Sequence, residues 1–441
     1  MSFSSQASFR TISAGFLAVI LTGAILLWLP FASHQDGYAD FLDCLFTATS
    51  ATCVTGLVVH DTASHWTLFG QIVILILIQL GGMGVLTVAL AITKLSGQQI
   101  DLRTRSSMQN SVSAPTMGGI VRLAAFIIKG TLLFEAVGTL LLAFSFCPIF
   151  GFWKGLWYAF FHSISAFCNA GFDLMGTYSG HYSSLTSFIT DPLVNLTVCP
   201  LIIIGGLGFL TWEDIYKNKL QWQRYSMQSK SIILLTTALI VLPFVFFYFF
   251  EHVNLTPTER FWSSLFQTVT VRTAGYNTVD FNLYSENGIF LFIVLMIIGG
   301  APGSTAGGIK ITTLTVLTVT AVSVYRRKDV PQCFGRRIPD ETVRDALAIL
   351  SLYMFLFAGS AMVISIAEGL PLITCLFETA SAIATVGVTM GITAKIGWLS
   401  KAILIFLMFF GRVGGLTIIY AAVKYNPAEQ ARCPKGSITV G

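Results

Sequence analysis

Long apolar segments alternate with shorter amphipathic ones along this chain, and the alternation occurs four times. The long segments that open each unit hold about 20 residues, the length a helix needs to cross a ~30 Å hydrocarbon core. They run over Ile12 to Ala32, Val121 to Phe146, Ser231 to Phe250 and Ala346 to Ala367. We therefore expect four membrane-spanning opening helices.

The segment after each opening helix is too short to span a bilayer. These segments run over Asp40 to Thr52, Trp153 to Cys168, Thr258 to Arg272 and Leu372 to Ala384. A helix rises about 1.5 Å per residue, so each can only enter the membrane halfway as a re-entrant helix. A second spanning segment closes each unit, at Thr67 to Leu95, Pro192 to Trp212, Asn287 to Val324 and Trp398 to Val423.

The predicted fold is an all-α polytopic membrane protein with eight spans and four re-entrant hairpins. Its four repeats would occupy residues 1–95, 96–220, 221–328 and 329–441, the last with a short cytosolic tail, around one pseudo-fourfold pore.

Each short segment ends in a turn that contains a glycine. The turns read V-T-G-L, N-A-G-F, T-A-G-Y and T-V-G-V, and their glycines are 115, 104 and 112 residues apart. This is the spacing of a supersecondary repeat. The predicted ion-binding residues are Val54, Thr55, Gly56, Asn169, Ala170, Gly171, Thr273, Ala274, Gly275, Thr385, Val386 and Gly387.

Non-helical backbone at membrane depth leaves carbonyl groups without partners, unless protein buries it or a water-filled cavity faces it. Four such turns around one axis would offer rings of carbonyl oxygens to a dehydrated cation. The C-terminal, partially negative ends of the four short helices would point at the same place. A single turn of this kind is equally typical of an ordinary loop, but four in register predict a selectivity filter.

Paired glycines occur in each closing segment. Those at Gly81 to Gly84 and Gly205 to Gly208 indicate close helix packing. The third cluster splits its span into pieces too short to cross a bilayer, which predicts an intramembrane gating loop, with a static kink as the alternative. The predicted gate comprises Gly299, Gly300, Ala301, Pro302, Gly303, Ser304, Thr305, Ala306, Gly307, Gly308 and Arg412.

Arg412 and Arg272 are cations inside apolar segments, where an unpaired charge is costly. We expect Arg412 to form an electrostatic barrier below the filter. We expect Arg272 to pair with Glu378 and so to brace the filter from behind. Acidic residues on the hairpin side would concentrate cations at the entrance, or would be ordinary solvated loop residues. They are Asp36, Asp40, Asp43, Asp61, Asp173, Asp191, Glu251, Glu259, Asp280, Glu286, Glu368 and Glu378.

Composition agrees with a membrane protein: 11% of residues are charged, 54% are hydrophobic, and the mean hydropathy is +0.75. The eight cysteines and six histidines show no spacing typical of metal ligation. Most of the 26 Lys and Arg residues fall in the termini and inter-repeat linkers, and only Lys154, Arg260, Lys395 and Lys401 lie on the hairpin side. The positive-inside bias therefore predicts cytoplasmic termini in a multi-pass cell membrane protein.

From about Thr11 to Val423 the chain resembles the Trk/Ktr/HKT superfamily of cation transporters, and within it the Ktr-type translocating subunits. The resemblance rests on the four glycine turns, the A-P-G-S-T-A-G-G loop and the F-G-R-V-G-G segment. It implies potassium uptake, often sodium-stimulated, by homodimers in the cell (plasma or inner) membrane. It also implies a cytosolic ring of KtrA-like nucleotide-binding regulatory subunits. Plant relatives that prefer sodium carry serine at the first filter glycine, so Gly56 implies potassium preference.

Nucleotide control would have to come from the partner, because the chain has no Rossmann fingerprint or Walker loop. The run G-S-T-A-G-G-I-K lies inside an apolar span with no preceding strand and does not predict a phosphate cradle. Two other classes of membrane protein are alternatives. A secondary transporter would bind an anionic substrate at the Gly299 to Gly308 break and Arg412. An intramembrane enzyme would need catalytic pairs or metal ligands that the sequence lacks, so we expect a transport protein and no enzyme.

Overall fold

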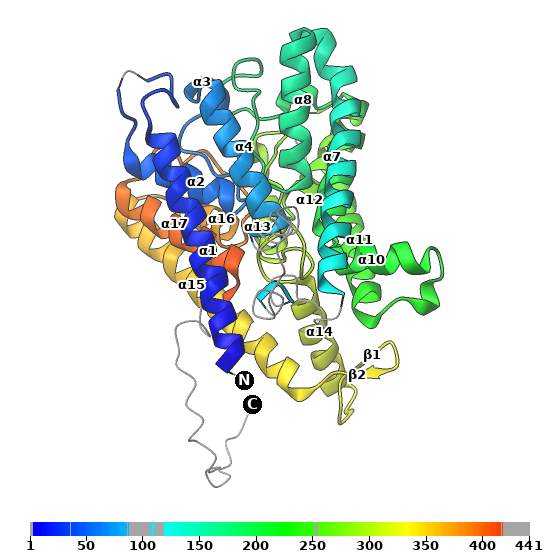
Figure 1. Ribbon diagram of the computed structural model, residues 1–441. Coiled ribbons are helices and arrows are strands. Elements are labelled where there is room, and N and C mark those ends of the chain that lie inside the picture. The colour runs from blue at the N-terminus through cyan, green and yellow to red at the C-terminus, as the bar shows by residue number, and fades with distance from the viewer. Residues whose placement is uncertain are drawn as a thin grey trace.

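The computed structural model describes residues 3–35, 37–85, 87, 107–109, 119–251, 255–415 and 417. Within these ranges the chain is mostly helical, and its helices stand around a common centre (Figure 1). Two antiparallel strands of two residues each, β1 (Gln332–Cys333) and β2 (Arg336–Arg337), form a hairpin that joins the third unit to the fourth. Single 3₁₀ turns occur at Thr186–Phe188, Trp222–Arg224 and Phe281–Leu283.

The four opening helices are present as predicted. They are α1 (Phe3–Trp28), α7 (Ile120–Phe150), α11 (Met227–Phe250) and α15 (Asp340–Glu368). Each contains an 18-residue window apolar enough to cross a membrane, and in α7, α11 and α15 only 22% of that window is buried inside the protein. The opening helices are therefore the lipid-facing wall, because apolar surface left uncovered by protein is covered by lipid.

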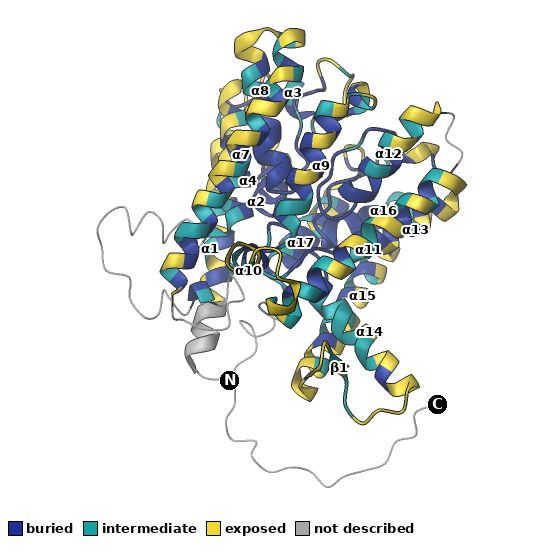
Figure 2. Cartoon of the chain, turned by 90° about the vertical axis from the view of Figure 1, so that its right-hand side faces the viewer, coloured by how far each residue is buried: buried dark blue, intermediate teal, exposed yellow. Residues whose placement is uncertain are grey.

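The short helices lie inside this wall. They are α2 (Phe41–Thr52), α8 (Phe152–Phe167), α12 (Pro257–Thr270) and α16 (Leu372–Ile383), each within a few residues of its predicted range. Nearly all residues in their C-terminal halves are buried. Figure 2 shows this buried interior surrounded by exposed opening helices. The all-α fold with re-entrant pore helices is thus confirmed.

The second closing segment is bent where a continuous span was predicted, whereas the third is broken as predicted. The closing helices are α4 (Leu68–Met83), α9 (Pro192–Gly206) followed by α10 (Phe209–Asn218), α13 (Glu286–Ile297) followed by α14 (Ile311–Tyr325), and α17 (Trp398–Val413). Helices α9 and α10 meet at a 98° bend. Only the third break was expected, and its two pieces match the predicted lengths. The predicted ends of the first and fourth closing spans lie outside the described residues.

Glycine in the left-handed region accounts for the other breaks. A glycine with positive φ follows each of these helices. After α4 it is Gly84 with φ 82°, after α9 it is Gly208 with φ 86°, and after α17 it is Gly414 with φ 92°. A residue with positive φ cannot continue a right-handed helix, and glycine adopts that conformation without steric cost. Of the described helices, four are long and apolar enough to cross a membrane alone, and the bent α9–α10 pair would make a fifth.

Polar contacts tie the outer end of each opening helix to the start of its closing helix. The Glu251 carboxylate accepts bonds from the Ser285 hydroxyl at 2.5 Å and the Ser285 amide at 3.1 Å. Glu368 accepts from the Gly397 amide at 2.8 Å and the Ser400 hydroxyl at 2.5 Å. Carboxylates at helix N-termini satisfy free N–H groups, so these contacts fix where each closing helix begins.

The first and second units use different groups for the same contact. The Thr67 hydroxyl donates to the Phe31 carbonyl at 2.8 Å, and the Ser145 hydroxyl donates to the Asp191 carboxylate. Asp191 also caps α9 by accepting from two backbone N–H groups. The four units therefore share an arrangement that their sequences achieve with different side chains.

Candidate ion-conduction pathway

The four glycine turns share one backbone conformation. The first residue of each turn is left-handed: Val54 has φ 57°, Asn169 59°, Thr273 79° and Thr385 52°. The glycine two positions later is left-handed as well, at 93° for Gly56, 67° for Gly171, 92° for Gly275 and 97° for Gly387. Positive φ costs about 1–3 kcal/mol at a non-glycine residue, so the surrounding structure must hold the first residue in place.

A serine lies one turn before the turn motif in three units, and in the first and fourth units both its carbonyl and its hydroxyl accept from the turn. The Ser50 carbonyl accepts from the Thr55 amide at 2.8 Å and its hydroxyl accepts from the Gly56 amide at 3.1 Å. Ser381 makes the same two contacts with Val386 and Gly387, at 2.8 and 3.0 Å. Each serine thereby holds the second residue and the glycine of its turn.

The second and third units vary this contact. The Ser165 carbonyl accepts from the Ala170 amide at 2.7 Å, but its hydroxyl donates to the Phe172 carbonyl at 2.8 Å. In the third unit Val269 takes the serine position, and the hydroxyl of Thr270 donates to the Tyr276 carbonyl at 2.6 Å. In both units the carbonyl of the residue after the glycine is held by a hydroxyl.

The turns contact one another in a closed cycle. A Cβ atom built on Gly56 would lie 2.5 Å from the Ala170 carbonyl oxygen, and one on Gly171 would lie 2.5 Å from that of Ala274. A Cβ on Gly275 would lie 2.6 Å from the Val386 oxygen, and one on Gly387 2.0 Å from the Thr55 oxygen. Each glycine thus faces a carbonyl oxygen of the next unit, and the fourth faces the first.

Two further contacts link the second turn to the third. The Asn169 side-chain amide and the Thr273 hydroxyl are hydrogen-bonded at 3.1 Å. The phenol of Tyr276, which is fully buried, donates to the Phe172 carbonyl oxygen at 3.1 Å. The Phe172 carbonyl therefore accepts from both Ser165 and Tyr276 and is held in one orientation.

The paired glycines of the closing helices let those helices pack directly on the ends of the short helices. A Cβ on Gly81 would lie 1.9 Å from the Thr52 carbonyl oxygen, and one on Gly205 would lie 2.1 Å from that of Phe167. A Cβ on Gly411 would lie 2.0 Å from the Ile383 oxygen. The close-packing interpretation of the first two glycine clusters therefore agrees with the structure, and it extends to the fourth.

The segment Gly299 to Gly308 crosses beneath the turns and contacts other units. Its Ala301 and Thr305 amides donate to the Gly206 and Gly205 carbonyls at 3.0 and 3.2 Å. A Cβ built on Gly307 would lie 2.1 Å from the Thr385 hydroxyl oxygen. The loop is therefore seated against the second unit and lies directly below the fourth turn.

Arg412 fastens this loop to the first unit. One terminal guanidinium nitrogen donates to the Thr305 carbonyl, and the other donates to the carbonyls of Gly81 and, at 3.2 Å, Gly82. Arg412 and the loop also line a cavity of about 290 Å³. Lys310, whose ammonium donates to the Ala306 carbonyl at 2.7 Å, lines the same cavity.

The predicted Arg272–Glu378 brace was wrong. Within the part of the chain that the structure describes, no carboxylate lies within 4 Å of Arg272, and its Nε has no hydrogen-bond partner. The Glu378 carboxylate instead accepts from the hydroxyls of Thr389, at 2.9 Å, and Thr393. Local hydroxyls in its own unit satisfy Glu378, and Arg272 lies on the other side of the turn, against α9 and α11.

Many of the acidic residues on the hairpin side cap helices. Asp40, Asp61 and Asp191 accept from backbone N–H groups at the starts of α2, α3 (Thr62–His65) and α9. Glu259 completes a capping box with Thr256 at the start of α12. For these residues the local structural role explains the carboxylate.

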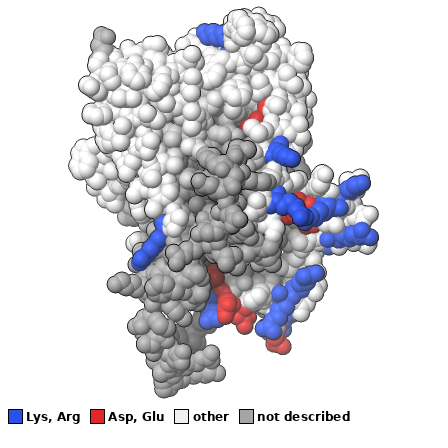
Figure 3. All heavy atoms as spheres, in the orientation of Figure 1, with Lys and Arg blue, Asp and Glu red and all other residues white. Residues whose placement is uncertain are grey.

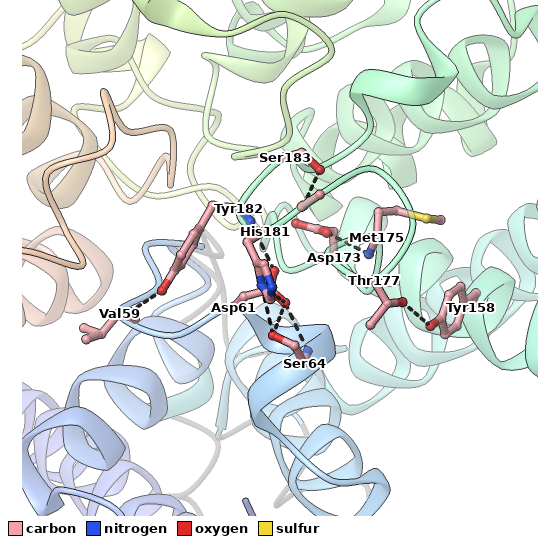
Figure 4. A network of polar contacts seen from close by, with 11 residues as sticks. Val59, Asp61, Ser64, Tyr158, Asp173, Met175, Thr177, His181, Tyr182 and Ser183 are labelled. Carbon is pink, nitrogen blue, oxygen red and sulfur yellow. Dashed lines mark hydrogen bonds and ion pairs between the residues drawn. The ribbon is translucent and has the colours of Figure 1, made fainter. Parts of the chain in front are cut away.

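Asp61 also joins two outer loops, as Figure 4 shows. Besides accepting from the amide and hydroxyl of Ser64, at 3.0 and 2.7 Å, it accepts from the Tyr182 amide at 3.3 Å and lies 3.9 Å from His181. The Tyr182 phenol donates to the Val59 carbonyl at 3.0 Å. The loops that follow the first two turns are thereby held together.

A second outer contact joins the first unit to the fourth. The Asp43 carboxylate lies 2.6 Å from the Lys401 ammonium and 3.0 Å from His60 Nε2. The His60 ring stacks on that of His65 at 4.0 Å between centroids. Burial lowers the pKa of His65 to about 4, and the nearby His60 acts in the same direction, so His65 is neutral at physiological pH.

Several of these supporting residues were missed in the sequence. Ser50, Ser165 and Ser381 each stand six positions before a turn glycine, a register that comparing the repeats could have revealed. Tyr276 carried no such signal, because its contact with Phe172 joins two units that only the tertiary fold brings together.

Comparisons with known proteins agree with this architecture. A family profile described as "TrkH: Cation transport protein" matches residues 1–432. The chain is 37% identical to the potassium/sodium uptake protein NtpJ of Enterococcus hirae, over 98% of this chain and 97% of that protein. It is 36% identical to the Ktr system potassium uptake protein B of Bacillus subtilis, over 98% and 96%.

The fold also resembles a solved structure. The crystal structure of the potassium transporter TrkH from Vibrio parahaemolyticus matches with a TM-score of 0.72, over 93% of this chain and 85% of that one, at 22% identity.

Four re-entrant helices whose glycine turns meet in one ring define a polytopic membrane protein of the ion-transport class. The chain belongs to the TrkH family of cation transport proteins, which are transporters and not enzymes.

Proposed function

We propose that this chain takes up potassium through a pore at the centre of its four repeats, with boundaries near residues 95, 220 and 328. The observation that carries the proposal is the closed cycle of contacts from Gly56, Gly171, Gly275 and Gly387 to the carbonyl of the next unit. Such a cycle gathers backbone oxygens from four units around one axis, where they can replace the hydration shell of a cation.

Unpaired hydroxyls support the same site. The side-chain oxygens of Thr55, Thr305 and Thr385 are buried without a hydrogen-bond partner among the described residues. Buried polar atoms almost always have partners, so those lining a pathway are suited to a passing cation or its water. Because the donors are neutral oxygens, they suit alkali metal ions.

We propose that Gly299 to Gly308 and Arg412 form the gate. The loop's main chain is held by backbone contacts to Gly205 and Gly206, and Arg412 links it to Gly81. Small residues let the loop move past its neighbours, while Arg412 opposes inward movement of cations until the loop shifts. A static kink would not require a cation that links three units.

These contacts argue against a secondary transporter that binds an anionic solute at the break. The terminal nitrogens of Arg412 already donate to carbonyls of Thr305, Gly81 and Gly82. Three of the five N–H donors of this guanidinium are thus used by main-chain oxygens, which leaves fewer of them for an anionic substrate.

The distribution of basic side chains supports a proposed orientation of the chain in the membrane. The names of the relatives support the proposed partners. Basic side chains gather over the lower half of Figure 3, around α10 and the β-hairpin, which supports cytoplasmic linkers and termini. The name of NtpJ includes sodium, and that of Ktr protein B refers to a Ktr system. We propose sodium-stimulated uptake by a homodimer that is regulated by a cytosolic KtrA-like nucleotide-binding ring.

Expression in a bacterium that lacks its own potassium uptake systems tests the proposal. The chain is expected to restore growth at low potassium, and Gly275→Ser is expected to reduce discrimination between potassium and sodium in tracer uptake. No growth from a chain that reaches the membrane, or unchanged discrimination, would count against it.

A further inference from the structure

A cavity of about 650 Å³ lies where the connection between α10 and α11 meets the β-hairpin. Three cationic side chains line it, Arg224, Lys230 and Arg336, together with one carboxylate, Asp214. Arg224 comes from the connection that leads into α11, Lys230 from the first turn of α11 and Arg336 from the hairpin, so the tertiary fold assembles the cluster. The visible basic side chains of this region stand out in Figure 3.

The three cations form no ion pair with any residue that the structure describes. Elsewhere on this side Lys217 pairs with Glu213 and Arg337 with Asp340, but no carboxylate of the described residues lies within 4 Å of Arg224, Lys230 or Arg336.

Asp214 offsets one of the three positive charges, so the described lining of the cavity keeps a net charge of +2 from Arg224, Lys230 and Arg336 against Asp214. The Asp214 carboxylate already accepts from the Ser226 amide at 2.8 Å and the Asn218 amide at 2.6 Å. The Lys230 ammonium donates to the Gln223 carbonyl at 3.1 Å and lies 5.9 Å from the ring of Phe334. The cluster therefore favours an anion.

A membrane-crossing α9 would place the cavity at the depth of lipid headgroups. Helix α10 turns 98° away from α9, so it runs along the membrane surface if α9 crosses it. Apolar side chains around the α10–α11 connection are exposed: Tyr216 74%, Leu220 98% and Trp222 41%. Aromatic and basic residues mixed in this way are typical of the membrane–water interface.

An apolar surface continues from the cavity toward the membrane core. Lys230 lies in the first turn of α11, and Leu234, four residues later, lies on the same helix face. Leu234 is 56% exposed. A phosphate bound at Lys230 would thus have uncovered hydrocarbon surface directly above it, where acyl chains could pack.

We propose that this cavity binds the phosphate of an anionic phospholipid, of the phosphatidylglycerol class, through Arg224, Lys230 and Arg336. A soluble phosphate compound would use the cations but not the exposed surface beside Leu234. A basic pocket against a spanning helix is a recurrent headgroup site.

The test measures lipid binding by the purified full-length protein. The protein is placed in phosphatidylcholine nanodiscs, and retention of added phosphatidylglycerol is followed by native mass spectrometry. The site variant combines Arg224→Gln, Lys230→Gln and Arg336→Gln. The control combines Arg326→Gln, Arg327→Gln and Lys328→Gln, which removes the same charge on the same side but outside the cavity. Arg336→Gln alone, on the hairpin, covers the case in which the triple variant does not fold.

The site variant is expected to bind phosphatidylglycerol at least about tenfold more weakly, and the control less than about twofold, since each interfacial cation contributes to anionic lipid binding. Arg336→Gln alone is expected to bind phosphatidylglycerol about threefold more weakly than the native chain. Equal losses of phosphatidylglycerol binding in the site and control variants, or no loss in either, would contradict a binding site in this cavity. Displacement of the lipid by an equal concentration of glycerol phosphate would overturn a lipid as its occupant.

Discussion

Gly387 and the carbonyl oxygen of Thr55 meet where the fourth unit contacts the first, so close that a Cβ on Gly387 would lie 2.0 Å from that oxygen. This contact closes the ring that three similar contacts begin. The ring is a property of all four units together, because each turn is positioned by the carbonyl of its neighbour.

Substituting Gly411 with alanine is expected to destabilise the protein. The new Cβ would lie 2.0 Å from the backbone oxygen of Ile383, which cannot move without displacing the end of α16. Overpacking of this kind costs about 1–3 kcal/mol or more. The thermal unfolding midpoint in detergent and tracer uptake measure the effect.

Gly359→Ala is the matched control for that change. Gly359 lies within α15, and a Cβ there would have no atom within 4 Å. Because alanine is a better helix former by about 1 kcal/mol, this variant should be as stable as the native chain or slightly more so. Equal destabilisation by both substitutions would contradict the packing role of Gly411.

Removing one partner of the Asp43–Lys401 pair is expected to be strongly destabilising. Their side chains are 10% and 13% exposed, and the pair joins α2 of the first unit to α17 of the fourth. Lys401→Met leaves a buried carboxylate without its nearest cation, at a cost of about 3–5 kcal/mol. Thermal unfolding of the single and double variants should show strong coupling.

The exposed pair Lys217–Glu213 serves as its control, with side chains 66% and 32% exposed. Lys217→Met should change stability by less than about 0.5 kcal/mol. Additive effects of Asp43→Asn and Lys401→Met would show that the buried pair does not act as a unit.

Arg412→Lys is expected to raise basal flux. A lysine ammonium cannot donate in the fork geometry that lets Arg412 contact Thr305 on one side and Gly81 on the other. The loop should therefore be less firmly held. Rubidium uptake into proteoliposomes without a regulatory partner provides the measurement, and native-like low flux would contradict the fastening role.

Glu378 should couple to Thr393 and not to Arg272. The Thr393 hydroxyl donates to the Glu378 carboxylate, whereas Arg272 makes no ion pair with it. In double-mutant cycles followed by thermal unfolding, Glu378→Ala with Thr393→Val should be non-additive. The effects of Glu378→Ala and Arg272→Ala on stability should be additive. A large coupling energy between them would support the Arg272–Glu378 pair after all.

Acid is expected to weaken the outer loops through His65. Burial lowers the pKa of His65 in the folded state to about 4, against an ordinary value of 6.5 in the unfolded chain. Between these values the unfolded chain binds the proton more readily, so the contribution of His65 to stability is lost as pH falls from about 6.5 to 4. His65→Phe keeps a ring beside His60 and should reduce the fall in the unfolding midpoint over this range. An unchanged pH profile would exclude His65 as the cause.

The repeat order, the opening helices and the short half-helices could all be predicted from the sequence. The reason is that membrane length and apolar character act locally: about 20 apolar residues can span the bilayer and 13 cannot. The glycine turns were also visible, because a left-handed position after an apolar helix has a local sequence signature, as at Gly56 and Gly275.

Only the tertiary structure decided which groups meet. Arg272 and Glu378 were paired on charge alone, yet Thr389 and Thr393 lie nearer to the carboxylate. The fastening of the loop by Arg412 likewise depends on carbonyls from units far apart in the chain. Sequence spacing carries the local periodicity of helices and turns, but partners across units are chosen by packing, which brings together residues that no local pattern connects.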